Sequence, residues 1–314
     1  MGNLKNYKRY PLNQCALYKC AQKKKLCQFL GTTSFELKAL LDTIEYRQFF
    51  IPKKNSQELR TITTPIFALK QIQKRIFVLL KKVERPDWLM SGEKGKNYVT
   101  NAEYHVANSY CLIIDINKFY DKCQREYVYS FFKNKLRCAP DIAKILTDLS
   151  TYQGGIPTGT SVSQILAYYA YEEMFKEIKT IADQYGVKFS LYVDDMTFSS
   201  DKYFSANKLI YEIRGCLNKY GHTLKQKKTR FYAKNTAKCV TGVIITVNKT
   251  LAVPNGKRKE IMDGLEKLND GTMDLKAAKI LVGRVSAARQ IEPKSFPSAK
   301  RNATKKLKEL QEKN

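Results

Sequence analysis

The stretch "SLYVDDMTFSS", residues 190–200, places two adjacent carboxylates, Asp194 and Asp195, inside a segment of β-prone composition. Apolar and polar residues alternate before the acids, and Thr197 and Phe198 resume the β-prone composition after them. We therefore expect a β-hairpin whose tip carries both acids. Neighbouring carboxylates raise each other's pKa unless a cation compensates them. The tip thus calls for a lysine, an arginine or a metal ion close by.

The charge balance favours a polyanionic partner. The chain of 314 residues has 56 Lys and Arg against 29 Asp and Glu, which gives a formal net charge of +27. This excess is typical of nucleic-acid-binding proteins and exceeds the roughly 2–8 charges that solubility requires of a small domain. Anionic membrane is the other candidate, but no apolar run approaches the roughly 20 residues of a membrane span.

The N-terminal residues carry no targeting signal that we recognise. They lack the apolar core of a signal peptide, and residue 6 is Asn where the myristoylation pattern requires Ser or Thr. We expect a cytoplasmic protein that does not bind membrane. The eight cysteines include no Cys-x-x-Cys pair and the chain has only two histidines, so we expect reduced, partly buried thiols rather than a zinc site.

Helical and strand patterns are mixed along the chain without strict βαβ alternation, which indicates an α+β fold. Residues 1–50 and 67–83 have helical patterns. Residues 52–65 resemble a basic hairpin that turns at Asn55 and Ser56. A short apolar run within 109–120 ends at Asp115 and suits a strand buried on both faces.

The second half of the chain continues this mixture. Apolar residues recur at every fourth position from Leu166 to Ala182, which predicts one long helix, and another helix is expected near 204–220. Residues 239–253 predict a further hairpin. The remaining residues predict helices with a basic face, interrupted by Pro293 and Pro297.

Asp115 and the paired acids suggest a metal-dependent reaction. Two divalent ions that clamp the attacking and leaving oxygens of a phosphoryl transfer need bridging carboxylates, and magnesium prefers such oxygen ligands. Consecutive strand side chains point to opposite faces, so the turn must redirect one acid of the pair. We expect Asp194 to face Asp115 as the principal ligand and Asp195 to be peripheral. Asp is also a common turn former, so the pair alone leaves a purely local role open.

Five stretches, in order along the chain, resemble the motifs of reverse transcriptases. They are "LRTITTPIFALKQIQKRI" (59–76) in the fingers, "IIDINKFYDKC" (113–123) as motif A, "GGIPTGTSVSQILA" (154–167) as motif B, "YVDD" (192–195) as motif C and "HTLKQKKTRF" (222–231) as motif D. The resemblance covers most of the chain and implies a right-hand polymerase fold of fingers, palm and thumb, with an antiparallel palm sheet flanked by helices. It implies N-terminal helices and fingers over 1–108, and a palm over 109–238 with inserted fingers elements at about 121–160. The palm–thumb hairpin and basic helical thumb would follow over 239–314.

Two further stretches are similar to the marks of retron reverse transcriptases. "NAEYH" (101–105) fits an Asn-Ala-x-x-His pattern and "VTG" (240–242) fits the second mark. We therefore group Asn101, His105, Val240, Thr241 and Gly242 as retron-signature and RNA-binding residues. Thr100 and Glu103 also form a plausible capping box, which would make the first stretch a helix start.

The resemblance implies roles for the acids and for a lysine. Asp115, Asp194 and Asp195 would hold two magnesium ions, and the main-chain carbonyl of Ile116 would complete one coordination sphere. Lys228 matches the motif D lysine, a candidate proton donor to the departing pyrophosphate.

The resemblance also implies a nucleotide site. Arg60, assisted by Lys53 or Lys54, would bind the triphosphate, and Tyr120 would exclude a ribose 2′-OH. Thr158 and Gly159 would lie near the incoming nucleotide. The chain departs from the family at Thr158, where Gln is common, and at Gln164, where Pro is common. Without the motifs, these residues would be read as surface charges and packed aromatics.

A retron enzyme copies a structured noncoding RNA, which is both template and primer, into branched RNA-linked single-stranded DNA (msDNA), and acts in antiphage defence. The implied partners are that RNA, its RNA–DNA product, dNTPs and a separate effector protein. Residues 256–314, with 15 Lys and Arg against 8 Asp and Glu, would grip the RNA. The alternatives are a group II intron-like reverse transcriptase, a catalytically idle RNA-binding protein and a metal-dependent nuclease.

Overall fold

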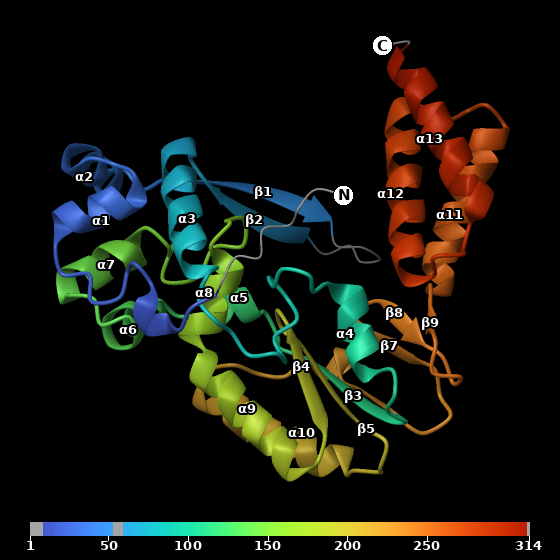
Figure 1. The fold of residues 1–314 in the computed structure, drawn as a ribbon, viewed down its shortest axis with the longest axis horizontal. Helices are drawn as coiled ribbons and strands as arrows, with labels where there is room; N and C mark the ends of the chain where they lie inside the picture. Colours follow the sequence, from blue (N-terminus) through green and yellow to red (C-terminus); the bar gives the residue numbers. More distant parts are fainter. Residues whose placement is uncertain (1–8, 53–58, 313–314) are drawn as a thin grey trace. The chain divides into compact units, whose positions relative to one another are not determined.

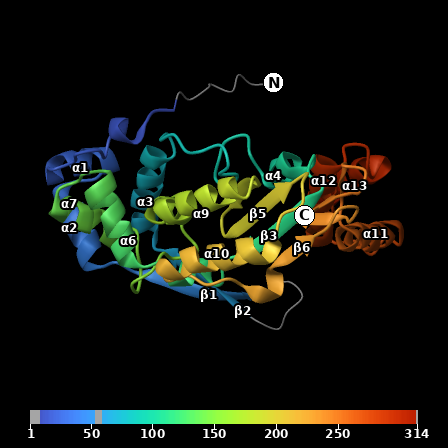
Figure 2. The same ribbon diagram turned by 90° about the horizontal axis from the view of Figure 1, so that it is seen from below.

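The expected acid-bearing hairpin lies within a four-stranded antiparallel sheet (Figure 1). The strands run in the order β4 (Lys188–Tyr192), β5 (Asp195–Ser200), β3 (Tyr110–Asp115) and β6 (Arg230–Tyr232). β3 and β5 lie side by side in both views (Figure 1 and Figure 2). Leu112, Ile114 and Phe198 are fully buried, as the apolar run of the sequence predicts for central strands.

The computed structural model describes residues 9–52 and 59–312, which divide into two compact units. Unit 1 comprises the described residues of Met1–Asp87, Ile116–Ile181 and Leu209–Lys225. Unit 2 comprises those of Trp88–Asp115, Ala182–Lys208 and Gln226–Asn314. The four-stranded sheet belongs entirely to unit 2. No helix among the described residues is long and apolar enough to cross a membrane.

Unit 1 combines helices with one two-stranded antiparallel sheet. Its sheet pairs β1 (Tyr46–Pro52) with β2 (Leu59–Pro65). Its helices are α1 (Lys23–Leu30), α2 (Ser34–Asp42), α3 (Phe67–Leu80), α5 (Phe119–Lys122), α6 (Arg125–Ser130), α7 (Pro140–Asp148), α8 (Ser163–Ala170) and most of α9 (Glu172–Gln184) and α10 (Ala206–Lys219). A reciprocal capping box between Thr33 and Glu36 fixes the start of α2.

Unit 2 adds a helix and a C-terminal bundle to the main sheet. Helix α4 (Tyr98–His105) packs against β4 and against a smaller sheet of β7 (Lys238–Val240), β8 (Val243–Ile245) and β9 (Leu251–Ala252). Helices α11 (Asn255–Asn269), α12 (Leu275–Ile291) and α13 (Pro297–Glu312) lie side by side (Figure 1). Their apolar faces share a buried cluster with the small sheet and α4, in which Val99, Val243 and Leu281 take part. The α+β prediction is confirmed by this mixture.

Two segments differ from the sequence prediction, and part of a third lies outside the described residues. Residues 46–50 form β1 rather than a helix, because this β-prone segment pairs in register with β2. The turn residues Asn55 and Ser56 and the expected nucleotide ligand Lys53 lie outside the described residues. Residues 239–253 form three strands rather than one hairpin.

The predicted long helix is interrupted at Tyr171, between α8 and α9. The hydroxyl of the fully buried Tyr171 accepts a hydrogen bond from Gln124 N–H (2.9 Å) and ties the interruption to the chain before α6. An apolar period of four continues across such a break, so the pattern does not reveal it. One helix start also differs. Asn97, not Thr100, caps α4, whereas the predicted interruption at Pro293 and Pro297 is confirmed, with α12 ending at Ile291 and α13 beginning at Pro297.

Candidate active site

The tip of the hairpin is a strained two-residue turn. β4 ends at Tyr192 and β5 begins at Asp195, which leaves Val193 and Asp194 between them. Val193 has a φ of +61°, in the left-handed region that β-branched residues rarely adopt, and such a conformation costs about 1–3 kcal/mol. The N–H of Val193 donates a hydrogen bond of 2.8 Å to Oγ of the buried Ser91. The surrounding structure therefore holds the turn in a conformation that its own sequence disfavours.

The segment that carries Ser91 runs along the outer side of β4. Leu191 N–H donates to the carbonyl of Trp88 (2.9 Å), and Met90 N–H donates to the carbonyl of Leu191 (2.8 Å). Leu89 and Leu191 form a parallel bridge. Both sides of β4 are thus hydrogen bonded, and the edge of the sheet is covered at the tip.

Asp115 and Asp195 face each other across the sheet. Asp115 is the last residue of β3 and Asp195 the first of β5, and the two are paired in register. We expected Asp194 to face Asp115, and the register corrects this. Val193 and Asp194 form the turn, so Asp195 is the first residue of β5 and pairs with Asp115. Asp115 is buried, with 3% of its surface exposed, and its carboxyl group hydrogen bonds with that of Asp195.

The acids repel one another and a lysine partly compensates them. Burial, followed by the charges of Asp194 and Asp115, raises the pKa of Asp195 to about 7, while Lys228 opposes the rise. Lys228, in the short 3-10 helix Gln226–Lys228, forms an ion pair with Asp115. Burial alone lowers the pKa of Lys228, but this ion pair and the neighbouring acids outweigh burial and raise it. The structure thus brings the four predicted catalytic side chains to one end of the sheet.

This donor set fits a hard divalent cation. Across residues 9–52 and 59–312, no three carboxyl, imidazole or thiol groups already converge as metal ligands. The carboxylates of Asp115 and Asp195 nevertheless lie opposite each other on adjacent strands, and Asp194 precedes Asp195 in sequence. A bound cation would relieve the repulsion between these carboxylates. The ammonium of Lys228 now compensates Asp115. Its side chain is 55% exposed, on a flexible stem, so it is able to move away when another cation binds.

The predicted nucleotide-binding residues belong to unit 1. Arg60 is exposed in β2, Tyr120 is half-buried in α5, and Ile116 is buried. Thr158 and Gly159 lie against β2. The hydroxyl of Thr158 donates to the carbonyl of Thr61 (3.2 Å), and Gly159 N–H donates to that of Thr63 (2.9 Å).

Only glycine permits the close approach at position 159. A Cβ atom there would lie 2.6 Å from the carbonyl oxygen of Thr63, well inside van der Waals contact. The motif B loop is therefore fixed to the strand that carries Arg60. The hydroxyl of Thr158, whose role the sequence left in doubt, is engaged with the backbone of that strand.

The retron-signature residues form a buried cluster in unit 2. Asn101 and His105 on α4 have 0% and 1% of their surface exposed, and Val240 is fully buried in β7. Thr241 and Gly242 form the turn between β7 and β8, both with positive φ. The expectation that these side chains as a group contact RNA is therefore corrected for Asn101, His105 and Val240, because burial removes them from the surface.

Sequence reasoning missed three serines, one that contacts the hairpin turn and two that contact His105. Ser91 binds the hairpin turn, and Ser190 and Ser199 bind His105. The only sequence signal was a small polar residue at a buried position of an otherwise apolar strand. Ser190 and Ser199 are 0% and 1% exposed.

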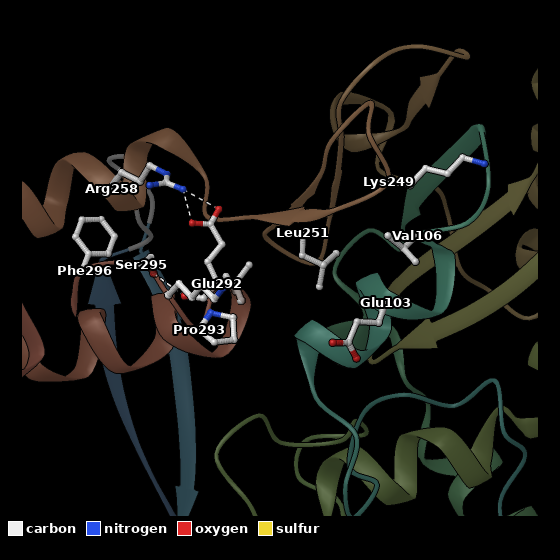
Figure 3. A pocket seen from close by; sticks show the side chains of 11 residues that line it. Glu103, Val106, Lys249, Leu251, Arg258, Glu292, Pro293, Ser295 and Phe296 are labelled. Carbon is white, nitrogen blue, oxygen red and sulfur yellow. Dashed lines mark hydrogen bonds and ion pairs between the residues drawn. The ribbon is translucent and has the colours of Figure 1, made fainter.

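Unit 2 carries two concave surfaces near the C-terminal helices, of which one is basic. One is lined along α12 and α13 by Arg289, Lys300, Arg301, Lys305 and Lys308 among others. Another groove of unit 2 is shown in Figure 3, where Arg258 and Glu292 form an ion pair beside Phe296. The three acids do not line either surface.

Comparison with known proteins gives consistent matches. The family model described as reverse transcriptase (RNA-dependent DNA polymerase) matches residues 51–250. The Retron Se72 reverse transcriptase of Salmonella heidelberg (strain 579083-10) is 29% identical over 195 residues, which cover 60% of this chain and 50% of the relative. Two Escherichia coli proteins also match. The Retron Ec86 reverse transcriptase is 26% identical over 69% of this chain and 68% of its own length. The Retron Ec83 reverse transcriptase is 24% identical over 79% of this chain and 83% of its own length. The chain thus spans half the length of the first of these relatives.

Proposed function

The chain belongs to the reverse transcriptase (RNA-dependent DNA polymerase) family, and from this premise we propose that it is the RNA-directed DNA polymerase of a retron. The resemblance predicted from the motifs, with its right-hand polymerase fold, is confirmed by the family match. The names of the relatives support the retron assignment. Within this proposal, residues 1–108 are N-terminal helices and fingers, 109–238 the palm with inserted fingers elements at about 121–160, and 239–314 the palm–thumb hairpin and thumb.

The proposed substrate is a structured noncoding RNA that serves as template and primer, and the proposed product is msDNA. The net charge of +27 and the basic surface on α12 and α13 support an RNA partner. A-form RNA is recognised by its shape, phosphates and 2′-hydroxyls, which lysine and arginine on a helix face contact without reading sequence. A separate effector protein and a role in antiphage defence complete the proposal.

The cluster of Asp115, Asp195 and Lys228 is the observation that carries the proposal. Reverse transcriptases generally use divalent metal ions, and we propose two Mg²⁺ ions held by Asp115, Asp194, Asp195 and the carbonyl of Ile116. When bound, these ions supply charge neutralisation for the reacting phosphates. Paired acids with this degree of repulsion suit a site that is completed by cations.

The side chains of the protein would bind and orient the nucleotide. Arg60, with Lys53, would hold the triphosphate through the guanidinium fork, and Tyr120 would fill the space of a ribose 2′-OH. Thr158 and Gly159 would support this site from β2, to which they are bonded. Lys228 is protonated at neutral pH, as the ion pair with Asp115 and the other acids raise its pKa further, so it would hold a proton at Nζ for the departing pyrophosphate.

The test is DNA synthesis by the purified full chain. The RNA transcribed from the DNA just upstream of the coding sequence is incubated with the protein, dNTPs and Mg²⁺, and the product is analysed for DNA joined to RNA. Asp194→Asn should abolish synthesis and leave RNA binding intact, because the acids bind metal rather than RNA. Asp201→Asn, an exposed acid beyond the other end of β5, is the matched control and should retain synthesis.

Three outcomes would contradict the proposal. RNA binding without synthesis by the wild-type chain indicates an idle RNA-binding protein. RNA cleavage indicates a nuclease. Synthesis that starts only from an added primer, with no RNA-linked product, indicates a reverse transcriptase of another class.

A further inference from the structure

Six buried or partly buried hydrogen bonds form one network, and three of them connect helix α4 to both strands of the acid-bearing hairpin. We call the residues that form them the His105 network: Tyr98, Asn101, His105, Asn108, Ser190, Ser199 and Thr241. The imidazole of His105 lies between two hydroxyls, with Nε2 2.7 Å from Ser190 Oγ and Nδ1 2.6 Å from Ser199 Oγ. Ser190 is in β4 and Ser199 in β5, so one side chain contacts both strands.

The network continues to the second signature stretch. Ser190 Oγ donates to Asn101 Oδ1 (2.6 Å), and Asn101 Nδ2 donates to Thr241 Oγ1 (3.4 Å). Thr241 Oγ1 donates to the backbone carbonyl of Tyr98 (2.9 Å). At the other end, Asn108 Nδ2 donates to Ser199 Oγ (2.6 Å). The two signature stretches, 140 positions apart at Asn101 and Thr241, thus meet in one network.

A carbonyl group sets the direction of every bond. The Tyr98 carbonyl can only accept, so the single hydroxyl proton of Thr241 is given to it, and Thr241 must accept from Asn101 Nδ2. The amide oxygen of Asn101 then accepts the proton of Ser190, which leaves Ser190 only lone pairs to offer His105.

The tautomer of His105 follows from this direction. Nε2 must carry the proton that is donated to Ser190. Nδ1 must then accept from the hydroxyl of Ser199, which itself accepts from Asn108. A protonated imidazole would have two donors and would break this order. Burial, with a smaller contribution from the charge of Lys188, lowers the pKa of His105 to about 3, which agrees with a neutral ring.

The network acts on the face of the sheet that carries the acids. Side chains two apart along a strand share a face, so Ser199 lies on the same face as Asp195, four residues or about 13 Å away. Ser190 precedes by two residues Tyr192, which pairs with Asp195. A conformation as strained as that of Val193 persists only where its surroundings over-determine it. Fixing both strands from α4 supplies such a constraint.

We propose that His105, as the neutral Nε2–H tautomer, is a positioning residue that fixes β4 and β5 and so places Asp194 and Asp195 for nucleotide addition. The inference deepens the proposed function and rests on it for the activity readout. It also gives the retron-signature residues Asn101 and Thr241 a common role, which is to hold this imidazole in one orientation.

The first experiment observes the tautomer directly. The chain has only two histidines, His105 and His222, so ¹⁵N-histidine labelling gives two imidazoles and His222→Phe leaves one. We expect an Nε2-protonated ring whose shifts stay constant between about pH 5 and 8, where an ordinary histidine titrates. An Nδ1-protonated ring, or one that titrates in this range, overturns the proposal whether or not the chain makes DNA.

The second experiment separates positioning from stability. His105→Phe keeps the ring but removes both hydrogen bonds, and outer-shell substitutions of this kind lower activity by about 10–100-fold. We expect that loss in kcat, measured at saturating RNA and dNTP, with RNA affinity changed by less than about twofold. The triple variant His105→Phe, Ser190→Ala, Ser199→Ala replaces all these partners with apolar groups. It should recover part of the melting temperature but not kcat, because no hydroxyl beside the ring is left unpaired, whereas the amides of Asn101 and Asn108 lose their serine partners.

The outcomes distinguish this proposal from the proposed function. If the wild-type chain makes no DNA, the proposed function fails. If the wild-type chain makes DNA and His105→Phe does so equally well, the positioning role fails. If the triple variant recovers kcat together with its melting temperature, the network serves stability alone and the proposal is overturned. Partial recovery of kcat by His105→Gln, which retains one donor and one acceptor, supports it.

Discussion

Replacement of Asp195 by Asn should stabilise the metal-free protein above neutral pH while it removes activity. The folded state raises the pKa of Asp195 from its ordinary value of 3.8 to about 7. The folded state therefore binds this proton more tightly than the unfolded state does. The contribution of this proton to the free energy of unfolding is fully present below about pH 4 and is lost as the pH rises through about 7.

The magnitude follows from that difference. At about 1.4 kcal/mol for each pKa unit, the rise corresponds to at most about 4 kcal/mol. Solvent reaches the hairpin tip and Lys228 is close by, so we expect about half of this, ~2 kcal/mol. For a chain of 314 residues, 2 kcal/mol corresponds to about 3 °C in melting temperature. Asn mimics the protonated carboxyl, so the variant should melt higher than the wild type by this amount at pH 8, by less at pH 5, and at the same temperature as the wild type below about pH 4.

The assay is thermal unfolding of both proteins, without metal, between pH 5 and 8. Taking the difference between them cancels the titration of groups that are distant from Asp195. Asp201→Asn is the control, because its carboxylate is exposed and its pKa is lowered, first by a hydrogen bond from Ser109, so the substitution should bring no gain at pH 8. Mg²⁺ at pH 8 should raise the melting temperature of the wild type more than that of Asp195→Asn. The proposed repulsion at Asp195 is wrong if Asp195→Asn melts no higher than the wild type at pH 8. It is also wrong if the gain in melting temperature is as large at pH 5 as at pH 8.

Three further outcomes are expected. Lys228→Ala should move the acidic limb of the kcat–pH profile upward, because the lysine charge lowers the pKa of Asp195; an unchanged limb would exclude electrostatic contact between them. Gly159→Ala should lower stability by about 1–3 kcal/mol in thermal unfolding, because its Cβ would meet the Thr63 carbonyl, whereas Gly215→Ala in α10, with open space around it, should be neutral or stabilising. RNA affinity should fall with salt with a log–log slope near −7 if about 8 phosphates are contacted, and charge-removing variants of α13 should make the slope shallower.

The sequence predicted those elements whose signal is local. The apolar run before Asp115 and the alternation around the paired acids gave β3, β4 and β5, since burial fixes the pattern of such strands. The periodicity of 67–83 gave α3, with Leu69 and Ile76 buried as expected. The motifs gave the family, because they constrain residue types at fixed positions in the order of the chain.

What the sequence did not predict depends on contacts between distant segments. Asp195 rather than Asp194 faces Asp115, because Val193 and Asp194 form the turn, which a hydrogen bond to the distant Ser91 helps to hold. The break at Tyr171 depends on a hydroxyl bonded to the distant Gln124. The network around His105 is built from serines that a strand pattern treats as interruptions.

The Tyr98 carbonyl has a consequence for engineering and for evolutionary drift. A backbone carbonyl oxygen can only accept a hydrogen bond, and no substitution changes it. The donor-to-acceptor direction of the six linked bonds is therefore set by the main chain and not by a side chain. A replacement side chain therefore fits only if it donates and accepts at the same places as the residue that it replaces. Grafting this hairpin into another scaffold would require moving α4 and the Thr241 turn along with it, as a single transplantable module.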